Sequence, residues 1–385
     1  MILSKQSRLA IVTESFYPVS DAPSIRMTAL VDALRANGHF DIKVYSSKKA
    51  AHEYKGISVR QNICPPSHNK QSSIRRILNE LVYGVETLLR LFFAKYDIII
   101  VTSPPFISTV ILSYFLIFFK RNRYVLDVRD YYPSVYFEAG LIKKESLPGK
   151  FFLKREKKLY DNALFVTAAT QGLVDEIGLK SNNAIHLFRN GYDANVFDVQ
   201  EKNKTGFEVM FHGSLSKFQD IEGLIKVAKR LNVERPEILV KVIGEGSQSY
   251  LLEESTLSNL EYLGKMNYQD VAKHVMGTSL GISLRTDGLI GKTAFPVKVY
   301  EYIGAGIPVV CTPISEAGEF IKDHKLGFQF KSDEIEKIVN NIIELYENPD
   351  LYDSIRANVI GIRETMSRKA QCDSFVNSLI KAIEQ

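Results

Sequence analysis

The sequence lacks the features of a secreted, disulfide-linked or zinc-binding protein. It contains only three cysteines, Cys64, Cys311 and Cys372, which are too few and too scattered for a disulfide framework or a zinc site. Residues 1–16 have no apolar core of the kind found in signal peptides. No low-complexity tract and no clear internal repeat occurs. We therefore expect a globular protein of the cytoplasm.

A glycine-rich phosphate-binding turn is also absent from the first βαβ unit. A strand is predicted at 8–13, a loop at 14–24, a helix at 26–36 with Ser24 as its N-cap, and a second strand at 41–46. A nicotinamide-binding domain needs Gly-x-Gly-x-x-Gly between the first strand and its helix. Because this loop contains no glycine, the sequence argues against a dehydrogenase.

Length and charge indicate two domains with different surfaces. The 385 residues suffice for two domains that each bury a core. Residues 1–190 carry 27 Lys and Arg against 16 Asp and Glu, whereas residues 191–385 carry 22 against 28. A basic half joined to an acidic half predicts that the first domain contacts an anionic partner, either nucleic acid or the inner membrane leaflet.

The uncharged run at 98–119 bears on this choice of partner. Ser103-Pro104-Pro105 divides it into a strand at 98–102 and an apolar helix at 106–119, which is too short to span a membrane. Basic clusters flank it at Arg75-Arg76, Lys120-Arg121-x-Arg123, Lys143-Lys144 and Lys154-Arg155-x-Lys157-Lys158. Each cluster alone is typical of a solvated face. Together with the apolar helix they favour a monotopic contact with anionic lipid over nucleic-acid binding.

Charged residues end the strand predicted at 124–130. Asp127, Arg129 and Asp130 come at its carboxyl end, where catalytic groups gather in open α/β sheets. Structural ion pairing is the alternative. In the second half, strands at 207–211, 238–243, 280–284 and 307–311 alternate with helices, which predicts a second parallel sheet.

The stretch 293–313 is the one around which the chain is organised. Pro296 suits the first position of a helix that ends at Gly304 or Gly306, and an apolar strand follows. Lys298 and Glu301 stand three apart and share a face, so an ammonium, a carboxylate and the helix N-terminus can take a phosphate and a diol together. A surface helix with an ordinary ion pair is the alternative.

Four motifs in order give the chain a family resemblance. These are Val128-Arg129-Asp130, Asn190-Gly191-x-Asp193, Gly244-Glu245-Gly246 and Pro296-x-Lys298-x-x-Glu301-Tyr302. The chain resembles the retaining GT-B glycosyltransferases of family 4, in particular a subgroup that builds bacterial surface polysaccharides such as O-antigen or capsule. The resemblance implies two Rossmann-like, doubly wound parallel-sheet domains facing a central cleft.

The resemblance implies domain limits and a set of site residues. An acceptor domain is expected at 1–192, joined by the last helix at 368–385, with a linker at 193–206 and a donor domain at 207–367. Asp130, Lys298 and Glu301 are expected to be catalytic, with Glu301 on the ribose of the nucleotide-sugar, and Asp127, Arg129 and Asp130 to lie on the acceptor side. The implied donor-binding set comprises Ser24, Gly213, Ser214, Lys217, Gly244, Glu245, Gly264, Met266, Arg285, Thr293, Ala294, Phe295, Pro296, Lys298 and Glu301.

The chain departs from the family pattern at three of its positions. Thr293 replaces a second Glu that contacts the donor sugar, and Ser214 and Gln219 replace an Arg and a Lys that bind the diphosphate. A leaving diphosphate needs positioned positive charge. Lys298 is our first candidate for it, followed by the cations at 285, 292 and 217.

These observations predict a glycosyltransferase. It would move a sugar from a nucleoside diphosphate, UDP in the first instance, to a carbohydrate acceptor carried on a polyprenyl diphosphate at the inner membrane face. No Asp-x-Asp motif occurs, so no metal or other cofactor is expected, and no nucleic acid as partner. Two alternatives stay open. One is a GT-B sugar-nucleotide epimerase or hydrolase, and the other is a non-catalytic binding protein on a degenerate transferase fold.

Overall fold

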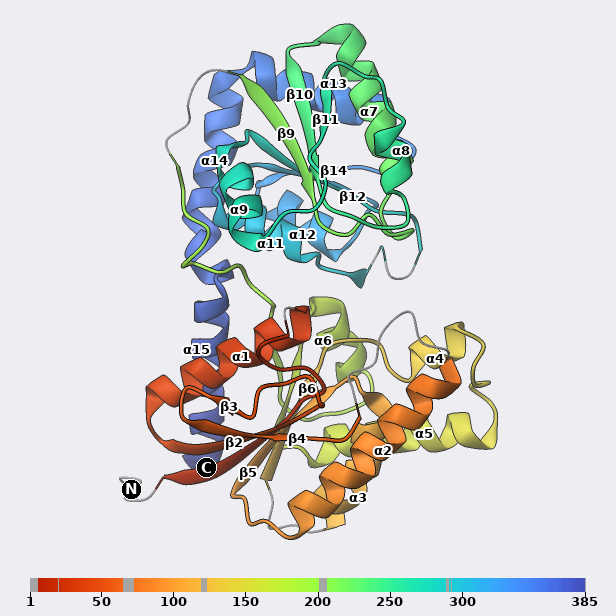
Figure 1. Cartoon of the computed structure of the whole chain (residues 1–385), viewed down its shortest axis with the longest axis vertical. Helices are drawn as coiled ribbons and strands as arrows, with labels where there is room; N and C mark the ends of the chain where they lie inside the picture. Colours follow the sequence, from red (N-terminus) through yellow and green to blue (C-terminus); the bar gives the residue numbers. More distant parts are fainter. Residues whose placement is uncertain are drawn as a thin grey trace. The chain divides into compact units, whose positions relative to one another are not determined.

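The computed structural model (Figure 1) describes residues 6–19, 21–64, 73–118, 123–200, 206–288, 291 and 293–384. The chain forms two units. Unit 1 comprises residues 1–189 and 372–385, and unit 2 comprises residues 190–371. Each unit is a parallel sheet covered by helices.

Unit 1 contains an eight-stranded sheet with the order β3-β4-β2-β1-β5-β6-β7-β8. All pairs are parallel except β3 with β4. The central strands β1, β5 and β6 are apolar and almost entirely buried, as expected for parallel strands covered on both faces. The strands are β1 (Ser7–Val12), β2 (Phe40–Ser46), β3 (Glu53–Tyr54), β4 (Ile57–Gln61), β5 (Ile98–Ser103), β6 (Arg123–Val128), β7 (Phe165–Ala168) and β8 (Ile185–Leu187).

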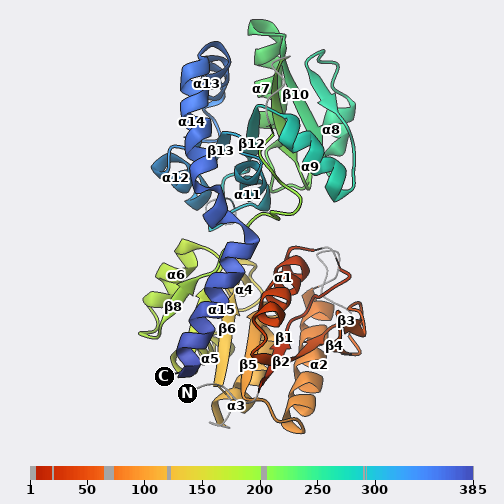
Figure 2. The same cartoon turned by 90° about the vertical axis from the view of Figure 1, so that its left-hand side faces the viewer.

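Helices cover both faces of this sheet. On one face α1 and α15 pack together in one apolar cluster, and on the other face α2, α3, α5 and α6 form a second cluster (Figure 2). The helices are α1 (Ala22–Asn37), α2 (Ser73–Phe92), α3 (Phe106–Phe118), α4 (Ser134–Glu138), α5 (Leu147–Asn162), α6 (Gln171–Gly178) and α15 (Arg368–Glu384). In the described residues no helix is long and apolar enough to cross a membrane.

Two boundaries in unit 1 differ from those predicted. Helix α1 begins at Ala22 because the Asp21 carboxylate caps it by accepting from the Ser24 N–H at 2.8 Å, so Asp21 and not Ser24 is the N-cap. Strand β6 ends at Val128. Arg129 and Asp130 therefore lie in the loop after the strand and not within it.

Unit 2 contains a six-stranded, fully parallel sheet with the order β11-β10-β9-β12-β13-β14. Its strands are β9 (Phe207–His212), β10 (Ile238–Ile243), β11 (Leu260–Tyr262), β12 (Leu280–Leu284), β13 (Val309–Thr312) and β14 (Gly327–Gln329). Its helices are α7 (Ile221–Glu234), α8 (Ser249–Glu253), α9 (Tyr268–Gly277), α11 (Val297–Gly304), α12 (Glu316–Asp323), α13 (Ile335–Glu347) and α14 (Pro349–Ile362), followed by the 3₁₀ helix η1 (Arg363–Met366).

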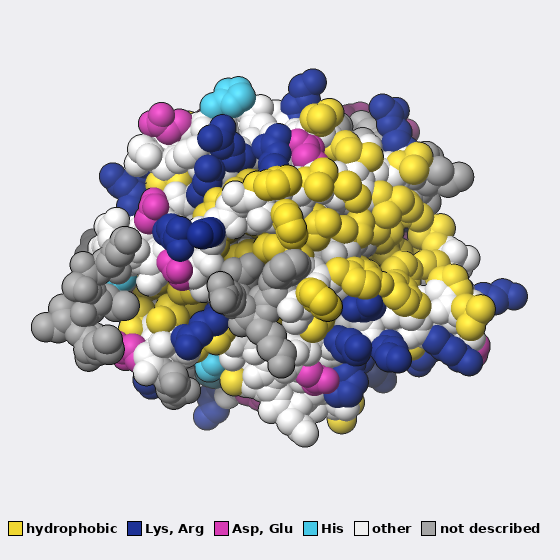
Figure 3. Space-filling model, turned by 90° about the horizontal axis from the view of Figure 1, so that it is seen from below, with side chains coloured by type: hydrophobic (Ala, Val, Ile, Leu, Met, Phe, Trp, Pro, Cys, Tyr) yellow, Lys and Arg dark blue, Asp and Glu magenta, His cyan; other side chains and the backbone are white. Residues whose placement is uncertain are grey.

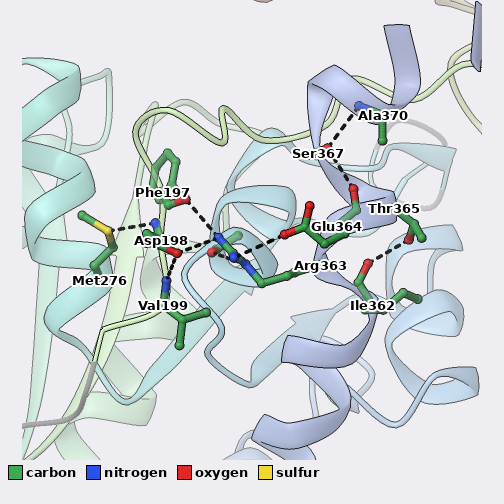
Figure 4. A network of polar contacts seen from close by, with 11 residues as sticks. Phe197, Asp198, Val199, Met276, Ile362, Arg363, Glu364, Thr365, Ser367 and Ala370 are labelled. Atoms are coloured by element: carbon green, nitrogen blue, oxygen red, sulfur yellow. Dashed lines mark hydrogen bonds and ion pairs between the residues drawn. The ribbon is translucent and has the colours of Figure 1, made fainter. Parts of the chain in front are cut away.

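The segment expected as a linker begins inside unit 2. Phe197 is fully buried in the core cluster around α11. Arg363 binds this segment from η1, donating to the Phe197 carbonyl at 3.1 Å and forming an ion pair with Asp198 at 3.3 Å (Figure 4). The chain accordingly passes from unit 1 to unit 2 at 189/190, and α15 returns it at 371/372. Residues 201–205 lie outside the described residues.

Candidate functional site

Helix α11 carries the site and is held deep in unit 2. Tyr302 is fully buried, and its hydroxyl donates to the Met210 carbonyl at 2.8 Å, which fixes the helix against β9. Gly281 of β12 makes room for the ring, because a Cβ there would lie 2.3 Å from Tyr302 ring atoms. Pro296 is the N-cap and has extended backbone. The helix therefore begins at Val297, one residue later than predicted. The helix is thus set by the core, and its polar residues have fixed directions.

Lys298 is a buried cation with specific contacts. Its Nζ donates to Gln219 Oε1 at 3.0 Å and lies 3.5 Å from the centroid of the Phe211 ring. Burial, and secondly the charge of Arg285, lower the pKa of Lys298 to about 7. Lys298 forms no ion pair with Glu301, so the alternative of an exposed ion pair on a surface helix is wrong.

Arg285 is the second cation of this site. It follows β12 directly and is half-buried, and burial lowers its pKa. Among the described residues no carboxylate lies within ion-pair distance of Arg285 or Lys298, and Arg285 Nε has no hydrogen-bond partner. Two desolvated cations without a carboxylate are costly in the free protein and favour an anionic ligand.

Glu301 lies on the same helix in a different setting. Its Oε2 is 3.4 Å from His212 Nε2, and the Tyr268 hydroxyl hydrogen-bonds to it. Burial raises the pKa of Glu301 to about 7, while Tyr268 and the charge of Arg368 act in the opposite direction. Burial, and then Lys298, lower the pKa of His212 to about 3, so this imidazole is neutral and adds no positive charge beside the carboxylate.

The loops at Gly213 and Gly244, both predicted for the donor, pack against each other. The Gly213 N–H donates to the Ile243 carbonyl at 2.9 Å, and the Gly244 N–H donates to the Gly264 carbonyl at 2.8 Å. A Cβ at Gly244 would lie 1.9 Å from the Gly213 oxygen, so the two loops touch through their backbones. The Gly213 N–H is therefore already paired within the protein in this structure. Gly213 instead lies beside the end of the Lys298 side chain.

The other predicted donor residues of unit 2 differ in their exposure to solvent. Ser214 and Lys217 are exposed, and Glu245 is exposed in an ion pair with Lys265. Phe295 is buried and stacks on Tyr300 with ring centroids 4.4 Å apart. Met266, Thr293 and Ala294 are half-buried. The cation predicted at 292 lies outside the described residues.

The acceptor-side candidates lie in unit 1 and divide into two kinds. Asp127 is fully buried, and its carboxylate accepts from Arg26 Nη2 and from the Thr167 hydroxyl, each at 2.8 Å. Asp127 therefore forms a structural ion pair with Arg26, which is the alternative given in the sequence analysis. The prediction of Asp127 as an acceptor-side residue is wrong, because its carboxylate is buried and paired. Ser24, predicted for the donor, is buried in α1 of the same unit.

Asp130 differs because its side chain is exposed to solvent. Burial of its surroundings raises its pKa, and the charges of Arg129 and Arg76 lower it in part. Arg76 of α2 also donates to the Tyr132 hydroxyl at 2.6 Å. A carboxylate with two guanidinium groups can bind a sugar hydroxyl beside an anionic group.

Sequence reasoning missed several residues that complete these sites. Gln219 was noted only as a replacement for a lysine, yet it accepts from Lys298. His212, Tyr268 and Arg368 approach Glu301 from β9, α9 and α15. Only His212 carried a usable signal, its place at the end of a strand before a glycine. The other contacts are long-range and leave no local pattern.

Comparison with known proteins agrees with this architecture. Residues 193–360 match the sequence model of the family described as "Glycosyl transferases group 1". An uncharacterized glycosyltransferase of Methanocaldococcus jannaschii is 24% identical over 251 residues, covering 64% of this chain and 66% of that protein. Chitobiosyldiphosphodolichol beta-mannosyltransferase of Candida albicans is 28% identical over 143 residues, covering 34% and 30%. The matches thus span 66% or less of these curated relatives.

Solved structures match over nearly the whole chain. Sucrose-phosphate synthase of Thermosynechococcus elongatus has a TM-score of 0.72 at 11% identity, covering 98% of this chain and all of that chain. HepE of Anabaena in complex with UDP has a TM-score of 0.70 at 16% identity, again covering 98% of this chain and 100% of that chain. WaaG, a glycosyltransferase involved in lipopolysaccharide biosynthesis, has a TM-score of 0.65 at 12% identity, covering 95% and 98%. The two parallel-sheet units therefore have the GT-B fold, and the family match with these neighbours supports a GT-B glycosyltransferase.

Proposed function

We propose that this protein is a metal-independent retaining glycosyltransferase of family 4 that uses a UDP-sugar donor. The observation that carries the proposal is the cluster in unit 2 of the buried cation Lys298 and the half-buried cation Arg285 beside the buried carboxylate of Glu301. A diphosphate matches the cations, and a ribose diol matches the carboxylate. A UDP complex is described for the Anabaena HepE structure, which supports UDP as the first nucleotide to test.

Each residue of this cluster has a distinct part in the proposed reaction. Lys298 and Arg285 bind the diphosphate and stabilise the negative charge that develops as its bond to the sugar C1 breaks. Glu301 accepts hydrogen bonds from the ribose hydroxyls and orients the nucleotide. The acceptor hydroxyl forms the new bond to C1 on the face that the diphosphate leaves, and its proton passes to the leaving phosphate.

In this proposal, unit 1 binds the acceptor. Asp130, flanked by Arg129 and Arg76, would hold a sugar hydroxyl while the guanidinium groups contact an adjacent diphosphate. A polyprenyl-diphosphate-linked sugar of bacterial surface polysaccharide synthesis has both groups. Two names support this class of acceptor: the Candida relative is named for a diphosphodolichol-linked sugar, and WaaG is described as acting in lipopolysaccharide biosynthesis.

The test is release of nucleoside diphosphate from UDP-sugars with and without a polyprenyl-diphosphate-linked acceptor. We expect release that depends on the acceptor, is lost in Glu301→Ala, and is strongly reduced in Asp130→Asn while donor binding is unchanged. The matched control is Asp353→Asn, an exposed carboxylate of α14.

The same assay separates the alternatives. Release at the full rate without acceptor would indicate a hydrolase, and conversion of the donor sugar without release would indicate an epimerase. Donor binding without either reaction would support a non-catalytic protein. Each of these results would overturn the proposal.

A further inference from the structure

Helix α2 has its apolar face on the outside of unit 1. Its exposed apolar residues recur at helical spacing and are each between 38% and 55% accessible. They form what we term the α2 face: Leu78, Leu81, Val82, Val85, Leu89 and Phe92. A surface helix of a soluble protein normally directs such a stripe toward the core.

Polar contacts on the inner side of α2 fix this orientation. Glu80 is 1% accessible, and its Oε2 accepts from the Ile107 N–H at 3.0 Å. The Tyr83 hydroxyl donates to the Thr13 carbonyl at 2.8 Å, and the Thr87 hydroxyl accepts from Asn62 at 2.7 Å. A Cβ at Gly84 would lie 2.9 Å from the Ser108 Cα, so α2 and α3 touch closely. A rotation of the helix that buried the α2 face would break all of these contacts.

The apolar surface continues onto two neighbouring helices. Phe92 contacts Phe115 of α3 with ring centroids 6.4 Å apart, and Phe118 at the end of α3 is 82% accessible. On the other side of α3, Arg155 of α5 stacks over Tyr114 at 3.7 Å and approaches Phe151 at 5.7 Å. Figure 3 shows this side of unit 1 as a broad apolar area with Lys and Arg side chains along its border.

Positive charge borders this surface. Lys154, Arg155 and Lys158 stand three, four and seven positions after Phe151 and therefore share its face of α5. Residues 73–158 contain fifteen Lys and Arg against eight Asp and Glu. Of those acids Glu80, Asp127 and Glu156 are buried in ion pairs, so the exposed charge is more positive than the count suggests.

We propose that the α2 face with its continuation on α3 and α5 docks on an anionic lipid bilayer. The helix would lie in the plane of the interface with its leucines among the acyl chains, while the lysines of α5 contact anionic head groups. The 20 residues of α2 give a strip of about 30 Å. This inference does not depend on the donor chemistry. It corrects the predicted lipid contact of the 106–119 helix, since α3 is mostly buried and α2 provides the surface.

The test is co-sedimentation of the full chain with vesicles of phosphatidylcholine alone and of equal parts phosphatidylcholine and phosphatidylglycerol. The variants are Val85→Glu with Leu89→Glu on α2, and Lys154→Glu with Lys158→Glu on α5. The matched controls are Val233→Glu and the pair Lys226→Glu with Lys229→Glu, which are exposed on α7 of unit 2. Thermal unfolding of each variant verifies that it folds.

We expect the wild type and controls to bind the anionic vesicles and to bind pure phosphatidylcholine far less. The α2 variant loses binding, and the α5 variant loses about 25-fold or more, because each basic residue at an anionic surface contributes about fivefold. High salt should weaken the wild type in the same way.

Three results would overturn the proposal. They are no binding to either vesicle, binding that the α2 substitutions leave intact, and equal binding to both vesicles. Self-association of the wild type that the α2 substitutions abolish, without lipid binding, would identify the surface as an interface between two copies instead.

Discussion

Replacing Lys298 by methionine separates its role in the site from its effect on stability. In the unfolded chain this lysine has its ordinary pKa of 10.5, whereas in the folded protein the pKa is about 7. The folded protein therefore bears an unfavourable buried charge at and below pH 7, which is relieved as pH rises and the ammonium deprotonates. Methionine keeps the length of the side chain and removes the charge.

The two pKa values give the size of the effect. At pH 7 the charge costs about 4 kcal/mol relative to the neutral form. The pKa shift already includes the contact of the ammonium with the Phe211 ring. Methionine leaves Gln219 Oε1 without its donor, which costs about 2 kcal/mol. Lys298→Met should thus be about 2 kcal/mol more stable than wild type at pH 7, although it loses the cation that we assign to the diphosphate.

The pH dependence is the sharper part of this prediction. Between pH 7 and pH 9 the wild type should gain about 2 kcal/mol relative to Lys298→Met. Urea unfolding followed by circular dichroism measures the difference at each pH, and Lys229→Met on the exposed side of α7 is the control without such a trend. A difference that stays constant over this range would refute the view that Lys298 is a desolvated ammonium.

Three further substitutions test other parts of the structure. The pKa of Glu301 is raised to about 7 by burial, so UDP affinity should fall by up to tenfold for each pH unit below 7 as the carboxylate takes up a proton; Glu301→Gln should abolish this dependence in a calorimetric titration. Gly281→Ala forces a Cβ into the Tyr302 ring and should cost about 1–3 kcal/mol by urea unfolding, and an unchanged midpoint would contradict the packing argument. Arg26→Ala leaves the buried carboxylate of Asp127 unpaired and should cost about 3–5 kcal/mol, whereas the double variant with Asp127→Leu should recover part of this loss; an additive double variant would count against the ion pair.

The sequence predicted the elements around α11 because local patterns encode them. Pro296, the face shared by Lys298 and Glu301 and the following apolar strand are all read from neighbouring residues. The partners of these residues were not predictable in this way. Gln219 reaches Lys298 across 79 positions, and nothing local to either residue indicates that contact.

The surface that we propose for lipid contact shows the same limit of local sequence patterns. The apolar helix predicted at 106–119, taken with the basic clusters around it, favoured a lipid contact through that helix, but composition does not say which of two packed helices lies outside. Two contacts decide which helix lies outside: the hydrogen bond from the Ile107 N–H to Glu80, and the close approach of α2 and α3 at Gly84. Both depend on the tertiary packing of α2 on α3. Likewise Asp127 and Asp130 were both predicted at the end of one strand, yet only the packing of Arg26 separates the structural carboxylate from the exposed one.

The most direct test of the central claim is a calorimetric titration of UDP, GDP, ADP and dTDP into the wild type, Glu301→Ala and the control Asp353→Asn. The account predicts that UDP binds the wild type and the control equally, and that Glu301→Ala weakens it by about ten- to a hundredfold, since hydrogen bonds to a charged group contribute about 1.5–3 kcal/mol. Absence of binding by all four diphosphates, or equal binding by Glu301→Ala, would contradict the assignment of the Lys298, Arg285 and Glu301 cluster as a nucleotide-sugar site.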